Sequence, residues 1–159
     1  MLLLLLLAAI VVVLATSHKS SGHTVHGGLR FLKVVEVTNA ACPAGQTGQT
    51  ASVRGDACYR LGDGLTVSKV KRIALRAPQA TSSGYSIQID LLPQDSGRLG
   101  SLTGEVAREQ QPRNQLAIVV GGKVVSAPQV IEPIPGGVIM ITGNFSRTEA
   151  QRYVDLIGG

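Results

Sequence analysis

The strongest constraint on the fold is a strictly alternating segment near the middle of the chain. From Tyr85 to Leu91, apolar side chains alternate with Ser86, Gln88 and Asp90. A period of two is typical of a β-strand that places one face on a core and the other toward water. The segment therefore predicts a half-buried strand, and any fold for this chain must include a sheet.

Other apolar and β-branched runs predict further strands. They lie at residues 29–37, 58–61, 67–75, 115–120, 123–126 and 138–142. Gly62-Asp63-Gly64 predicts a turn between the second and third of these runs. Gly121-Gly122 is a two-residue glycine turn, which is typical of an antiparallel hairpin. Residues 40–56 are polar and rich in glycine, and they predict an exposed loop.

A change of periodicity predicts a helix after Pro93. Leu99, Leu102 and Val106 recur at three and four residues, and Pro112 marks the limit of the segment. Glycines weaken a helix by roughly 1 kcal/mol each relative to alanine, unless the missing side chains permit close packing. We expect such packing on the sheet for three glycines: Gly97, Gly100 and Gly104.

A capping box predicts the start of a second helix. Ser146 is followed three residues later by Glu149, and Phe145 precedes the cap, where it can pack on Ala150. Asn144-Phe145-Ser146 also matches an N-glycosylation acceptor, but a helix cap accounts for the same residues. The predicted helix then runs toward the end of the chain.

The order of these elements predicts the fold class. Aromatic residues make up 3% of the chain and Trp is absent, so the core must consist of Val, Ile, Leu and Ala. Strand, strand, helix, hairpin, strand, helix is the order of an α+β fold, here an antiparallel-rich β-sheet with two helices packed on one face, as in ferredoxin-like proteins. We expect a single domain over residues 29–159.

The N-terminus carries an apolar run, Leu2 to Ala15. A helix of that length spans about 21 Å, which is short of a hydrocarbon core of about 30 Å. Residues 1–17 are therefore expected to be a cleaved signal peptide or, because no basic residue precedes the run, the end of a truncated membrane anchor. Both alternatives place the domain outside the cytoplasm, secreted or attached to the cytoplasmic membrane. Residues 18–28, with Ser, Gly and His, are expected to form a flexible linker.

Charge alone does not identify a partner. The formal net charge is +5, but the aromatic residues are scattered and no basic stripe with stacking rings can be drawn, so no nucleic-acid partner is expected. Four cations near the middle of the chain are expected to protect an edge strand, with contact to anionic lipid or wall polymer as the alternative: Lys69, Lys71, Arg72 and Arg76.

Catalytic, cofactor and metal sites are not expected. Ser126 lacks the G-x-S-x-G context of a nucleophile, and no His follows His26 to act as its base. The pairs Gly121-Gly122 and Gly136-Gly137 do not open a helix after a strand, so they are interpreted as turn glycines rather than a phosphate loop. No role is assigned to the three histidines, which lie in the expected linker: His18, His23 and His26.

The chain has two cysteines, Cys42 and Cys58, separated by loop-like sequence. A disulfide is the simplest interpretation, because it agrees with an exported protein and would restrict the unfolded chain by about 3 kcal/mol. A metal pair would need further ligands, which the neighbouring sequence does not offer.

The last third of the chain contains LAIVVGGKVVSAP (116–128) and ITGNFSRTEA (141–150), with Ile134 and a Gly-Gly between them. In order and spacing, these stretches resemble the head subdomain of the first large extracytoplasmic loop of SecD, a subunit of the bacterial preprotein translocase. The motif residues are Gly121, Gly122, Ser126, Pro128, Gly136, Gly137, Thr142, Gly143, Asn144 and Phe145, and Gly121 stands where the family usually has Asp. ACYRLGDG (57–64) and residues 85–103 are similar to the actinobacterial form of this loop, and residues 29–37 resemble the strand that begins it in SecD.

The resemblance implies a role in protein export. Proteins of the SecD type couple proton movement to export through membrane helices that carry acidic residues, and all ten acidic residues here follow the apolar run. We therefore expect a non-enzymatic, protein-binding accessory of export that cannot itself transduce proton-motive force. Its implied partners are unfolded exported polypeptide or translocon subunits. The alternative is a structural module of the cell envelope that reuses the head fold without a role in export.

Overall fold

A computed structural model describes residues 22–80 and 83–158. Expectations for residues 1–17 and for His18 fall outside the described residues. The elements, in chain order, are β1 (His23–Thr38), β2 (Gln49–Ala51), β3 (Cys58–Arg76), β4 (Tyr85–Leu91), α1 (Pro93–Val106), β5 (Leu116–Val120), β6 (Lys123–Ser126), β7 (Val138–Phe145) and α2 (Arg147–Gly158).

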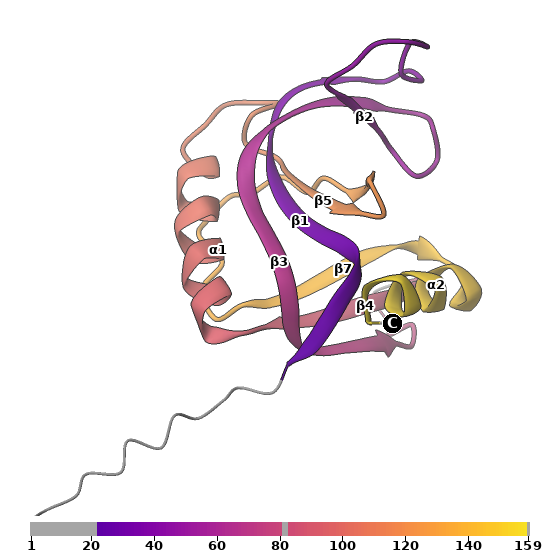
Figure 1. Cartoon of the computed structure of the whole chain (residues 1–159), viewed down its shortest axis with the longest axis vertical. Coiled ribbons are helices and arrows are strands. Elements are labelled where there is room, and N and C mark those ends of the chain that lie inside the picture. Colours follow the sequence, from indigo (N-terminus) through magenta and orange to yellow (C-terminus); the bar gives the residue numbers. More distant parts are fainter. Residues whose placement is uncertain (1–21, 81–82, 159) are drawn as a thin grey trace, which may run out of the picture.

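The strands form one strongly curled, antiparallel sheet in the order β6-β5-β1-β3-β4-β7, with β2 added beside β3 (Figure 1). Ser52, which follows β2, forms a bridge with Val124 of β6, and the Val53 amide donates to the Val124 carbonyl at 2.9 Å. One end of the sheet is thereby closed into a ring of β6, β5, β1, β3 and β2. Strand β7 ends the sheet on the other side.

Both helices pack on the same face of the sheet. The larger core cluster contains Phe31 of β1 and Ile89 of β4 together with Leu99 of α1 and Ile157 of α2. All four side chains are completely buried. The expected α+β fold, with an antiparallel-rich sheet and two helices on one face, is confirmed.

A second, smaller cluster lies on the other face of the sheet, within the closed ring. It consists of Val34, Ala117, Val119 and Val124. Strand β5 contributes alternate residues to both clusters, and all five of its residues are buried. Burial on both faces explains why this strand is a continuous apolar run rather than an alternating one.

Strands β1 and β3 are longer than expected. The linker predicted at residues 18–28 and the turn predicted at residues 62–64 are both wrong, because these strands run through them where the structure describes them. β1 begins at His23, so the second half of the expected linker at 18–28 is paired strand, with an irregular register between Thr24 and Leu29. β3 runs without a turn through residues 62–64. A Cβ on Gly64 would lie 2.0 Å from the Phe31 carbonyl oxygen, so glycine permits a close approach of two paired strands instead of a turn.

Residues 67–75 form part of a strand, as expected, but the prediction that this strand lies at an edge is wrong. β3 has β1 on one side and β4 on the other. Two of its four cations, Arg72 and Arg76, bond side chains of the neighbouring strand β4 instead. Arg72 bonds Asp90 at 2.7–2.8 Å and Arg76 bonds Gln88 at 2.8 Å. The polar set of β4 was expected to face water, but Ser86, Gln88 and Asp90 are buried, and the last two bond these arginines.

The hairpin predicted at Gly121-Gly122 and the helix cap predicted at Ser146 are both present. Gly121 and Gly122 have positive φ values of 59° and 77°, as a two-residue turn between β5 and β6 requires. At the start of α2 the Ser146 amide donates to Glu149 Oε2 at 2.8 Å, and the Glu149 amide donates to Ser146 Oγ at 3.3 Å. These are the two reciprocal bonds of a capping box.

Candidate functional site

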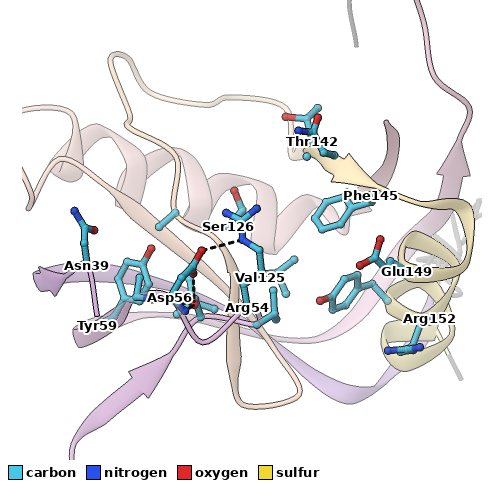
Figure 2. Close-up of a pocket in the computed structure, with 18 residues that line it drawn as sticks. Asn39, Arg54, Asp56, Tyr59, Val125, Ser126, Thr142, Phe145, Glu149 and Arg152 are labelled. Carbon is cyan, nitrogen blue, oxygen red and sulfur yellow. Dashed lines mark hydrogen bonds and ion pairs between the residues drawn. The ribbon is translucent and has the colours of Figure 1, made fainter. Parts of the chain in front are cut away.

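A cleft of about 630 Å³ lies between the closed end of the sheet and the end of β7. Figure 2 shows its two sides: Arg54, Asp56 and Tyr59 on one, and Thr142, Phe145 and Glu149 on the other. Val125 and Ser126 of β6 lie between them. The cleft therefore combines residues from the β2–β3 loop, the outer hairpin strand, the last strand and the last helix.

The first wall is a compact turn between β2 and β3. Ser52 Oγ donates to Asp56 Oδ1 at 2.8 Å and accepts from the amides of Asp56 and Ala57 at 3.1 and 3.2 Å. Arg54 bonds the other oxygen of Asp56 at 3.1 Å. The Ser52 hydroxyl, and then Arg54, hold the pKa of Asp56 below its usual value. This carboxylate is thus ionised and already occupied by local donors.

A disulfide fixes the base of that wall. Cys42 and Cys58 are joined, at a sequence separation of 16, and Cys58 also pairs with Ala51 across the β2–β3 ladder. The bond ties the long loop before β2 to the strand that carries Tyr59. A disulfide of this kind is typical of proteins that fold in oxidising compartments.

The second wall is the junction of β7 and α2. Phe145 and Tyr153 meet edge to face, with ring centroids 5.7 Å apart, so Phe145 packs on Tyr153 as well as against the core cluster that holds Ala150. Two bonds from Ser146 lower the pKa of Glu149. Asn144 Oδ1 accepts a bond from Ser83 at 2.9 Å, which ties this junction to the start of β4.

Two tyrosines, Tyr59 and Tyr153, line the cleft. Burial raises the pKa of Tyr59, and the nearby Asp56 raises it further. Burial likewise raises the pKa of Tyr153, with Glu149 adding to the effect. Both phenols are therefore protonated at neutral pH, and each offers an O–H group beside an aromatic surface.

The cleft brings together acidic, hydroxyl and aromatic side chains. Its acidic side chains, Asp56 and Glu149, have lowered pKa values, whereas a general acid needs a raised one. Ser126 lies in the cleft without a histidine among the lining residues. Within residues 22–80 and 83–158, no group of three or more His, Cys, Asp or Glu side chains is placed to hold a metal ion.

The structure brings together only part of the sequence motif. Five motif residues line the cleft, along with the cap residue Glu149: Ser126, Thr142, Gly143, Asn144 and Phe145. Gly121 and Gly122 form the hairpin turn. Gly137 has a φ of 66°, and a Cβ there would lie 1.9 Å from Ser96 Oγ, while its carbonyl accepts the Leu91 amide at 2.8 Å. The Pro128 carbonyl accepts the Leu116 amide at 3.0 Å.

Sequence reasoning missed the whole first wall and the helical side of the second. The missed residues include Asn39, Ser52, Arg54, Asp56, Tyr59, Arg152 and Tyr153. The only local signal was a serine four residues before an aspartate in a glycine-bearing loop, which is typical of a side-chain-capped turn. Nothing in that signal indicates that the turn lies opposite α2.

The described helices include none that is both long and apolar enough to cross a membrane. This finding concerns only the part of the chain that the structure describes.

Comparisons with known proteins point to one family. Residues 47–157 match the family described as SecDF, P1 head subdomain. The protein translocase subunit SecD of Streptomyces coelicolor is 34% identical over 77 residues, which are 48% of this chain and 14% of that protein. The chain thus spans only a small part of the length of this relative.

Two solved structures share the fold. One, described as the structure and function of a membrane component SecDF that enhances protein export, matches with a TM-score of 0.56 and 17% identity over 87% of this chain and 64% of the other. A crystal structure of SecDF in a super-membrane-facing form matches with a TM-score of 0.57 and 18% identity over 86% of this chain and 19% of the other. Since the family match extends over most of the described chain, this protein belongs to the SecDF P1 head subdomain family.

Proposed function

We propose that this protein is a non-enzymatic, extracytoplasmic accessory of protein export that binds exported polypeptide while it is unfolded. The family and the name of the SecD relative support the connection with export. The disulfide supports a location outside the cytoplasm. Leu2 to Ala15 would serve as the export signal or as an anchor, and the N-terminal residue of the mature protein, determined by mass spectrometry, distinguishes the two.

The observation that carries this proposal is the chemistry of the cleft. It offers protonated tyrosines, amides and hydroxyls beside the rings of Phe145 and Tyr153. Its charged groups are balanced, with Arg54 and Arg152 against Asp56 and Glu149. A ligand with alternating polar backbone and varied side chains suits such a surface, whereas a strongly charged ligand does not. Extended polypeptide has these properties.

The proposal extends to energy coupling. A membrane-buried carboxylate is the usual element of a proton relay, and the run from Leu2 to Ala15 contains no acidic residue. We therefore propose that this chain holds polypeptide without itself carrying protons.

Binding of an unfolded protein tests the proposal. Fluorescence anisotropy of labelled, reduced and carboxymethylated α-lactalbumin, titrated with the purified protein at moderate salt, should show saturable binding. Ser126→Arg fills the cleft and should weaken this binding at least about tenfold. The matched control is Ile131→Arg, which adds the same charge at a side chain that is 86% exposed and outside the cleft lining.

The same titration separates the proposal from its alternative. A structural envelope module predicts no binding by the unaltered protein and no co-purification with translocon subunits. Absence of both would contradict the proposed function.

A further inference from the structure

Strand β7 is an open edge of the sheet without the usual protection. Among the described residues, β4 is its only strand partner, and it ends the strand order. Sheet edges are normally guarded by charge, by proline or by coverage, because their unpaired backbone groups attract other chains. The sequence VIMITGNF contains neither a charge nor a proline. The opposite edge differs, because β6 is covered at Val124 by the Ser52–Val53 segment.

The register shows which backbone groups of β7 are free. The Leu91 amide donates to the Gly137 carbonyl at 2.8 Å, and the same register pairs Ile89 with Ile139. Hydrogen-bonded and non-hydrogen-bonded pairs alternate in an antiparallel ladder. The N–H and C=O groups of Ile139 therefore point to β4, whereas those of Val138 and Met140 point away from it.

The side chains at the same two positions are unusually exposed for their type. Val138 is 54% exposed and Met140 is 45% exposed, and both lie on the sheet face away from the helices. Two outward-facing peptide groups and two apolar side chains thus occur together at alternate positions. An added strand would meet both, as in β-strand addition.

The free edge leads into the cleft. Thr142 to Phe145 continue β7 and form one wall, and Val125 and Ser126 lie between it and the opposite wall (Figure 2). A chain that pairs with Val138 and Met140 and continues in the direction of β7 enters the space between these walls. The edge supplies backbone hydrogen bonds, and the cleft supplies contacts for the side chains that follow.

We propose that exported polypeptide binds by adding an extended strand to the outer edge of β7 and continuing into the cleft. This inference rests on the proposed function and specifies the ligand as a segment in β-conformation, recognised mainly through its backbone. Backbone recognition is indifferent to side-chain identity, as binding of many different exported chains requires.

A second copy of this chain fits the same edge less well. In a folded copy, β7 is followed by α2 after the single residue Ser146, and it is preceded by the Gly136-Gly137 turn and the chain that packs on α1. Neither end of such a strand is free to continue into a cleft of about 630 Å³. An unfolded segment has no such attachment.

Substitutions at Met140 test the inference. Met140→Pro removes an N–H group that does not pair with β4, and Met140→Lys adds the charge that natural edges use against pairing. Each should weaken binding of labelled, reduced and carboxymethylated α-lactalbumin at least about tenfold. Ile131→Lys is the matched control for charge and should bind as the unaltered protein does. The lysine variant preserves the test if the proline variant does not fold.

Amide hydrogen exchange, measured by NMR, gives an independent readout. Added polypeptide should slow exchange at Val138 and Met140, while Ile139 is protected with or without it because it already bonds β4. Equal binding by the Met140 variants and the unaltered protein would overturn the inference and leave the proposed function standing. No binding by the unaltered protein would overturn both. A dimer in sedimentation experiments that Met140→Pro dissociates would assign the edge to a second copy and would also overturn the inference.

Discussion

At the scale of single residues, the glycines of this domain have different structural roles. Gly137 combines a positive φ with a close approach to Ser96, and Gly64 allows two strands to approach within the sheet. Gly97 has neither function, because a Cβ there would meet nothing within 4 Å. The sequence suggested close packing on the sheet for the glycines of α1, but a Cβ built on Gly100 or Gly104 would meet only the loop at Pro133 and Ile134, at 3.6 Å or more.

Gly97→Ala is expected to stabilise the protein by up to about 1 kcal/mol, because alanine has the higher helix propensity and the site is open. Gly137→Ala is expected to destabilise it by more than about 1 kcal/mol, because φ is positive and Ser96 occupies the space. Urea unfolding of both variants measures these changes. Destabilisation by Gly97→Ala would show that α1 is packed more closely than described.

Asp90 should make folding stability depend on pH in the acid range. Hydrogen bonds from Gln88 and from Arg72 lower its pKa in the folded protein. Its contribution is therefore present above the unfolded value of about 3.9 and is lost as pH falls through the lower folded value. Urea unfolding between neutral pH and pH values below about 3 should show a smaller acid-induced loss for Asp90→Asn than for the unaltered protein. Equal losses would contradict this assignment.

At the scale of elements, the first wall of the cleft depends on covalent and polar restraints more than on a core. The loop before β2 is largely exposed, and the Cys42–Cys58 disulfide connects it to β3. Ser52 then organises the turn that follows β2. The position of Tyr59 and Asp56 relative to α2 follows from these restraints.

Replacing Cys42 and Cys58 by serine is expected to lower the free energy of unfolding by about 3 kcal/mol, because the disulfide closes a loop with a sequence separation of 16. Chemical denaturation of the oxidised protein and of the double variant provides the measurement. Mass spectrometry with and without reductant first establishes that the bond is present. Two free thiols in the exported protein would refute the pairing.

At the scale of the whole molecule, local sequence patterns predicted which elements form better than they predicted which elements lie side by side. The hairpin at Gly121-Gly122 and the capping box at Ser146 depend on adjacent residues, and both are present as predicted. The burial of Asp90 and the interior position of β3 depend on strands distant in sequence, and a pattern of alternating residues does not identify those strands. The residues of the cleft near the end of β7 were predicted from the sequence motif, but the opposite wall was not, because curling of the sheet brings the two walls together.

The central claim is that the space beside β7 holds polypeptide during export. A photoreactive phenylalanine analogue in place of Phe145, which already lines the cleft with a ring of similar size, should form a covalent adduct in living cells with an exported protein that is stalled during translocation. The same analogue in place of Ile131, an exposed residue outside the cleft, should not. Adducts of equal yield at both positions, or at neither, would contradict the account.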